Sequence, residues 1–143
     1  MTAKEYLDHI KRCYQTMQAL YDRLVEVRTK IEGLKAITYD RERVQVSPSN
    51  KTEELIAQLV DTEDKLSKEV REHFDEVVEA TKRIYSLDNE RQIQVLEMRY
   101  IKGMRWQVIA DELDIEYRSA TRLHGKALRN FERKYQDVLE VSL

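Results

Sequence analysis

Apolar side chains recur every seven residues over the first 34 residues. One set contains Ala3, Ile10, Met17, Leu24 and Ile31, and a second, offset by three, contains Tyr6, Cys13, Leu20, Val27 and Leu34. This repeat places both sets on one seam of a helix that packs against a partner helix. Thr2 and Glu5 have the spacing of a capping box. The pattern therefore predicts a long helix that begins near Ala3.

A second seven-residue repeat runs from Ile56 to Leu87. Its two sets are Ile56, Glu63, Val70, Val77 and Ile84, and Leu59, Leu66, His73, Ala80 and Leu87. Between the two repeats, Val44 and Val46 alternate with polar neighbours and look extended. Pro48 excludes helix at Ser47, and Asn50 can cap the helix that follows. Each repeat predicts a helix of about 50 Å.

Two long amphipathic helices with a short connection most simply fold as an antiparallel hairpin. We expect this hairpin, coiled-coil-like, to form a first domain over residues 1–88. A seam this narrow buries little apolar surface on its own. We therefore expect the protein to be a homodimer or a higher oligomer, with the hairpin serving dimerisation or partner binding.

Composition narrows the class of protein. The chain has three Gly and one Pro in 143 residues, which favours long helices over an all-β fold. No apolar run is long enough for a membrane span or a secretory signal, so we expect no membrane partner. The single cysteine, Cys13, fits a reducing compartment, and we expect a cytoplasmic location.

The last third of the chain differs in charge from the rest. Residues 1–90 hold 15 bases and 19 acids, whereas residues 91–143 hold 10 bases and 8 acids. All six bases between Arg118 and Lys134 face only one acid, Glu132. Any site for a polyanion is therefore expected in this C-terminal third.

Apolar spacing in residues 89–143 predicts three shorter helices, at about 90–102, 105–113 and 117–136. A helix, a turn and a second helix that crosses closely over Ala110 form a helix-turn-helix, whose second helix can enter a DNA groove. If Ala120, Leu123 and Ala127 face inward, the basic side chains face outward. The predicted contacts to double-stranded DNA are Tyr117, Arg118, Thr121, Arg122, Lys126 and Arg129.

The stretch "LEMRYIKGMRWQVIADELDIEYRSATRLHGKALRNF" resembles region four of bacterial sigma factors, which reads the −35 promoter element. Matching residues are Leu96, Arg99, Tyr100, Gly103, Ile109, Ala110, Leu113, Ile115, Leu123, Ala127 and Leu128. The full layout, with "RVQVS" between two long helices and "RLHGKAL" near the end, resembles small sigma-region-four-like proteins of phages and prophages, related in kind to late-gene transcription activators.

This resemblance implies a DNA-binding transcriptional regulator that could recruit host RNA polymerase. Three positions depart from the family pattern. Asp114 stands where the family has a turn glycine, Glu116 where it has a Ser or Thr cap, and Arg105 caps the supporting helix. No sigma region two is recognisable upstream, so the chain is not expected to open a promoter alone.

Other readings stay open. The protein could be a structural DNA-packaging component, or a protein-interaction module whose helix-turn-helix no longer contacts DNA. The basic face could also be merely solvated.

No phosphate-binding Gly loop or paired-carboxylate site is recognisable, so we expect no enzyme and no cofactor. We expect no metal site either, although His73 has Glu69 and Glu76 at helical spacing. His9 and His124 have no partner for metal binding at a suitable spacing in the sequence. We interpret Cys13 as a small buried apolar residue. Trp106 is expected to pack on the supporting helix.

Overall fold

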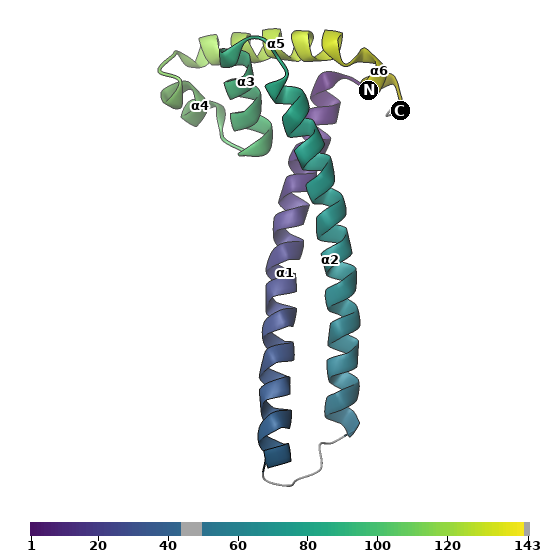
Figure 1. Cartoon of the computed structure of the whole chain (residues 1–143). Coiled ribbons are helices and arrows are strands. Elements are labelled where there is room, and N and C mark those ends of the chain that lie inside the picture. Colours follow the sequence, from purple (N-terminus) through teal and green to yellow (C-terminus); the bar gives the residue numbers. More distant parts are fainter. Residues whose placement is uncertain (44–49, 142–143) are drawn as a thin grey trace. The chain divides into compact units, whose positions relative to one another are not determined.

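The computed structural model describes residues 1–43 and 50–141 (Figure 1). The described residues form helices and turns with no strand, which confirms the predicted all-α class. The helices are α1 (Ala3–Arg43), α2 (Asn50–Tyr85), α3 (Glu90–Leu96), the π-helical η1 (Glu97–Ile101), α4 (Trp106–Glu112), α5 (Tyr117–Lys134) and α6 (Gln136–Val141). The predicted extended segment at Val44–Val46 and the break at Ser47 lie outside the described residues, as does the side chain of Asn50. Within the described ranges, no helix has the length and apolar character needed to cross a membrane.

The chain divides into two compact units. The terminal unit comprises Met1–Gln15 and Phe74–Leu143, and the hairpin unit comprises Thr16–His73. The predicted boundary between residues 88 and 89 falls in the turn between α2 and α3, inside the terminal unit. The boundary at residue 88 concerned function and stays a prediction. It does not coincide with the boundary between the two packed units.

In the hairpin unit, α1 and α2 pack through the predicted seam. Leu24, Val27 and Ile31 of α1 form a small core with Leu66 of α2. Next to this core, Arg28 Nε lies 3.7 Å from Glu63 Oε1. All predicted seam positions of both helices, in both units, are buried or half-buried. The two heptad repeats are therefore confirmed.

The same two helices pair in the terminal unit, in antiparallel order. The Arg83 guanidinium donates to the Tyr6 hydroxyl at 2.6 Å, and Cys13 donates to Glu76 at 3.0 Å, so positions later on α1 meet earlier positions on α2. The capping box at the start of α1 is confirmed. The Glu5 N–H donates to Thr2 Oγ1 at 3.1 Å, and the Thr2 N–H donates to Glu5 Oε2 at 3.3 Å.

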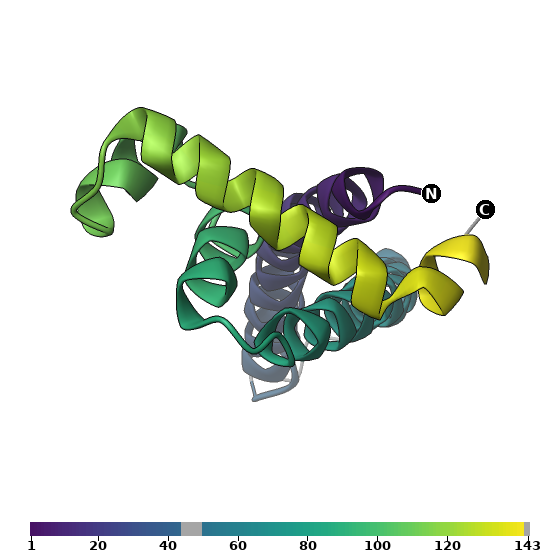
Figure 2. The ribbon, with the colours of Figure 1, turned by 90° about the horizontal axis from the view of Figure 1, so that it is seen from above.

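Helix α5 crosses the start of α1 and the end of α2 within the terminal unit (Figure 2). The Phe131 ring stacks on Tyr6 at 5.8 Å, and the Glu132 carboxylate accepts from the Ala3 N–H at 3.3 Å. The core beneath α5 draws on nearly every helix of the unit. Its buried apolar residues include Tyr6, Leu7, Ile10, Val77, Ile84, Val95, Leu96, Tyr100, Ile109, Phe131 and Leu139.

Two predicted helices differ from those observed. The expected helix at 90–102 changes at Glu97 into the π-helical turn η1, which ends before Gly103. The expected helix at 117–136 stops at Lys134, and Tyr135 breaks the helical conformation before α6. Tyr135 lies 5.0 Å from the Phe131 ring, and its hydroxyl bonds to Ser86. These tertiary contacts end α5 where no Gly or Pro marks the sequence.

Candidate nucleic-acid interface

The turn between α4 and α5 is a Schellman motif built on Asp114. The Ile115 N–H donates to the Ala110 carbonyl at 3.0 Å, and the Asp114 N–H donates to the Asp111 carbonyl at 3.2 Å. This geometry requires a left-handed residue, and Asp114 has φ of 54°. Asp114 thus has the left-handed conformation that glycine most often takes in such turns.

A guanidinium from α3 holds this turn in place. Arg91 Nη1 donates to the Leu113 carbonyl at 2.9 Å, which satisfies one of the last carbonyls of α4. Farther along, Asn130 of α5 donates to the buried Gln92 of α3 at 2.7 Å. Helix α5 is therefore fixed against α3 near its C-terminal end, while α4 supports its beginning.

Trp106 packs on the supporting helix, as predicted. Its ring meets His124 of α5 edge-on at 4.6 Å, and the Arg99 guanidinium lies over it at 4.9 Å. His124 Nε2 lies 2.7 Å from the Tyr100 hydroxyl. Burial, followed by the charges of Arg99 and Lys4, lowers the pKa of His124 to about 4. A neutral imidazole thus joins η1, α4 and α5.

The two faces of α5 separate as the sequence predicts. Ala120 and Ala127 are fully buried, and Leu123 is half-buried against the core. Of the six predicted contact residues, five are exposed: Tyr117, Arg118, Arg122, Lys126 and Arg129. Thr121 is half-buried, and its hydroxyl donates to the Arg118 carbonyl at 3.0 Å.

One base on the same face was missed from the sequence. Arg133 is exposed and follows Arg129 by four residues, so it continues the line of Arg118, Arg122, Lys126 and Arg129. We call these five residues the basic stripe. They span about 22 Å of helix at 1.5 Å per residue. The signal was in the sequence, since the spacing of 4, 4, 3 and 4 keeps one face of a helix.

The only acid of α5 is engaged at the N-terminus of α1. Glu132 accepts a hydrogen bond from the Ala3 N–H, and Lys134 donates one to the Ser86 carbonyl. Both charged side chains therefore make contacts within the protein. Glu132 is therefore held by the fold rather than paired with the basic stripe. Five exposed bases in a line attract a polyanion, because the electrostatic potentials of neighbouring like charges add.

Gly125 lies beside this stripe without a close neighbour. A Cβ placed there would meet only Arg129 Nη1, at 3.6 Å, which is ordinary contact. Close approach to another helix of this chain therefore does not explain the glycine at this position. The N-caps Arg105 and Glu116 make no side-chain cap hydrogen bond, and neither is one of the residue types that cap helices well.

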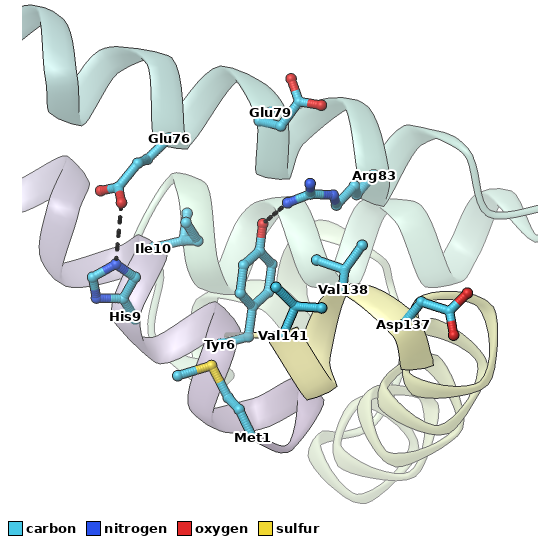
Figure 3. A pocket seen from close by; sticks show the side chains of 10 residues that line it. All are labelled: Met1, Tyr6, His9, Ile10, Glu76, Glu79, Arg83, Asp137, Val138 and Val141. Atoms are coloured by element: carbon cyan, nitrogen blue, oxygen red, sulfur yellow. Dashed lines mark hydrogen bonds and ion pairs between the residues drawn. The ribbon is translucent and has the colours of Figure 1, made fainter. Parts of the chain in front are cut away.

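A second cluster lies where α1 and α2 meet in the terminal unit, and it corrects the expectation for His9. His9 Nε2 lies 3.4 Å from Cys13 Sγ and 3.7 Å from Glu76 Oε1. His9 and Glu76 line an open pocket of about 810 Å³, with Tyr6 and Arg83 farther along it (Figure 3). The prediction that His9 has no ligand partners was wrong, because Glu76 arrives from the other helix of the hairpin.

Cys13 is buried, as predicted, but it is not only an apolar group. Its thiol donates to Glu76 Oε2 at 3.0 Å. Burial, together with this hydrogen bond and the Glu76 charge, raises the pKa of Cys13 to about 12. The thiol is therefore protonated near neutral pH and donates a hydrogen bond to Glu76.

Comparison with curated proteins and with solved structures found no match. A family model does match, over residues 33–132, and its description is "Protein of unknown function (DUF1492)". The matched residues include the end of α1 and all of α2, α3, η1 and α4, and they end within α5. Since they make up more than two thirds of the chain, the protein belongs to the DUF1492 family.

Proposed function

We propose that this protein is a DNA-binding transcriptional regulator that reads duplex DNA with α5. The observation that carries the proposal is the basic stripe on the outer face of a helix whose inner face is fixed by α3 and α4. A helix of this kind can lie in the major groove, where arginines reach guanine edges and phosphates. The sigma-region-four resemblance of the same residues supports the assignment.

The supporting elements give α5 the rigidity that groove recognition needs. The Schellman turn at Asp114 sets the angle between α4 and α5, and Arg91 braces that turn from α3. The start of α5 exposes Tyr117 and Arg118 beside backbone N–H groups that lack a side-chain cap. Such N–H groups and bases together suit a phosphate at the edge of the groove.

Gly125 has a role in this arrangement. It lies beside the basic stripe with open space around it, so a DNA backbone could approach α5 closely at that point. Its cost of about 1 kcal/mol relative to alanine would then be offset by binding.

The hairpin unit supports the second part of the proposal, in which the protein acts as an oligomer. Among the residues of this unit that the structure describes, six large apolar side chains are exposed: Tyr21, Val25, Ile37, Tyr39, Leu55 and Val60. Contact with a second copy would cover such residues. Two copies would present two reading helices to two half-sites, which increases affinity. Recruitment of host RNA polymerase by this assembly is implied by the resemblance to phage late-gene activators.

The same exposed residues favour a second candidate function. A structural component, such as a DNA-packaging subunit, would use the hairpin to assemble a ring and α5 to hold DNA. A protein-interaction module would use the hairpin alone. A packaging component would differ from a regulator in forming a ring instead of a dimer. A protein-interaction module would differ in not binding DNA.

Fluorescence anisotropy with random duplex DNA and with fragments of the source genome tests the function. We expect preferred fragments, and an affinity that falls steeply with salt concentration. An Arg118→Ala/Arg122→Ala variant should bind about tenfold more weakly or worse, and its salt slope should be about two smaller. Each lost arginine removes about one counterion release on binding.

A matched control removes the same charge elsewhere in the terminal unit. Arg12→Ala/Lys82→Ala changes two exposed bases on α1 and α2 and should bind DNA nearly as the wild type does. Equal loss in both double variants would mean that net charge, and not α5, determines binding. Absence of binding even at low salt would reject a DNA-binding function.

A further inference from the structure

We propose that His9, Cys13 and Glu76 bind one divalent transition-metal ion of the zinc class. His9 and Cys13 lie one turn apart on α1, and Glu76 comes from α2. Their donor atoms all lie within 4.8 Å of one another. Imidazole, thiolate and carboxylate are the three side-chain ligands that zinc takes in proteins.

The separations of the donor atoms match a tetrahedral site. Cys13 Sγ is 3.4 Å from His9 Nε2 and 3.0 Å from Glu76 Oε2, and Nε2 is 3.7 Å from Glu76 Oε1. Bonds of about 2.0 Å to nitrogen and oxygen and about 2.3 Å to sulfur, at tetrahedral angles, place ligand atoms about 3.3–3.6 Å apart. The distances from Cys13 and His9 end on different oxygens of Glu76, so a rotation of that carboxylate with small shifts of the other two side chains would complete the coordination.

Both helices hold their ligands on a rigid backbone. Residues four apart on a helix share one face, which aims His9 and Cys13 at the same point. Ile10 of α1 and Val77 and Ala80 of α2 are buried beside the ligands and fix the helices there. Paired helices that supply inward ligands are a common setting for protein metal sites.

The site has a buried floor and an open mouth. Cys13 is 3% exposed, whereas the side chains of His9 and Glu76 are 44% and 50% exposed. The pocket in Figure 3 leads from solvent to these two ligands. An ion could enter by this path, and a water molecule could occupy the fourth position. The thiol proton, which now forms the hydrogen bond to Glu76, would leave to solvent when the sulfur binds the ion.

Structural stability alone does not account for this arrangement. A His–Glu pair as exposed as this one contributes little to folding, because solvent screens it and both side chains lose freedom. The geometry nevertheless brings two further donor atoms to one buried sulfur. Metal binding accounts for all three residues at once.

Cobalt(II) titration of the reduced full-length protein, followed by absorbance, is the test. We expect one equivalent of cobalt to bind, with a thiolate-to-cobalt charge-transfer band and the intense visible bands of tetrahedral cobalt. Zinc added afterwards should displace the cobalt and remove both signals. Lack of the charge-transfer band, or binding without a defined stoichiometry, would overturn the proposal.

Four variants assign the ligands. His9→Ala, Glu76→Gln and Cys13→Ser should each weaken zinc binding by about 100-fold. Glu79→Gln is the matched control, because it makes the same change one turn along α2 and should bind zinc as the wild type does. Circular dichroism checks folding; if the buried Cys13→Ser variant does not fold, the half-exposed His9 and Glu76 variants decide. Wild-type affinity in those two variants would reject the site. This result is independent of DNA binding.

Discussion

Two residues in the C-terminal helices adopt left-handed backbone conformations, and each of them ends a helix. Gly103, with φ of 66°, follows η1, and Asp114, with φ of 54°, follows α4. A side chain costs roughly 1–2 kcal/mol in this region, although aspartate tolerates it better than most residues. The path of the chain into α4, and then into α5, therefore depends on these two positions.

Alanine substitutions at two glycines should change stability in opposite directions. Gly103→Ala should lower the free energy of unfolding by about 1–2 kcal/mol, because the new Cβ is strained at positive φ. Gly125→Ala should raise it by up to about 1 kcal/mol, since Gly125 is helical and its new Cβ meets only ordinary contact. Urea unfolding followed by circular dichroism measures both changes. Shifts of the same sign would contradict this account of the backbone.

Single residues show how far the sequence could predict the site. The exposed face of α5 followed from helical spacing, and the left-handed turn followed from the position of Asp114 in the helix-turn-helix pattern. The cluster of His9, Cys13 and Glu76 did not follow. Its third member is 63 residues from Cys13, and only the register of the two helices brings them together. The spacing of His9 and Cys13 was the only local signal.

Among the elements, the long helices were predictable and the short ones were less so. A seam that repeats over five heptads determines which face of α1 and α2 is buried, so both helices followed from periodicity alone. The π-helical turn η1 and the short α6 depend on contacts from distant residues. Leu139 is buried in α6, for example, but a single apolar residue carries no period. Tertiary packing determined these ends.

The packing of η1, α4 and α5 around His124 should make stability depend on pH. His124 is half-buried, forms a hydrogen bond with the Tyr100 hydroxyl, and has Arg99, Lys4 and Asp8 as its charged neighbours. Its pKa is about 4 in the folded protein, below the ordinary value of 6.5. The unfolded chain therefore takes up a proton first as the pH falls. Stability is present above pH 6.5 and should fall by about 3 kcal/mol between pH 6.5 and about 4.

Urea unfolding at several pH values between 7 and 4.5, for the wild type and for His124→Gln, measures this effect. Glutamine can still accept the Tyr100 hydroxyl but does not titrate. The variant should be less sensitive to pH over this range, even if it is less stable at pH 7. An unchanged pH dependence would mean that another group is responsible.

At the scale of the whole molecule, the hairpin unit determines the assembly that we propose. Its seam buries few residues, and on the described part of its two helices six large apolar side chains are exposed. A regulator that addresses two half-sites requires two copies, whereas a packaging component requires a ring. The number of copies therefore distinguishes the two candidate functions.

Light scattering of the full-length protein should give the mass of a dimer. Tyr21→Glu should shift it toward monomer at the same concentration, because a charge would be buried in the contact between copies. Ala19→Glu adds the same charge at an exposed position on the opposite side of α1 from Tyr21 and should leave the dimer intact. A ring would favour the packaging component, and a monomer would contradict both assemblies.

The terminal unit is formed from the two ends of the chain, and this affects how the protein folds during synthesis. Ala3, Tyr6 and Ile10 complete a core whose other side includes Phe131 and Leu139. These contacts have a very large sequence separation, which slows folding. The first helical turns leave the ribosome long before α5 and α6 are made, so part of their apolar surface stays uncovered until then. A nascent chain that stalls before residue 131 therefore exposes a core surface that chaperones recognise.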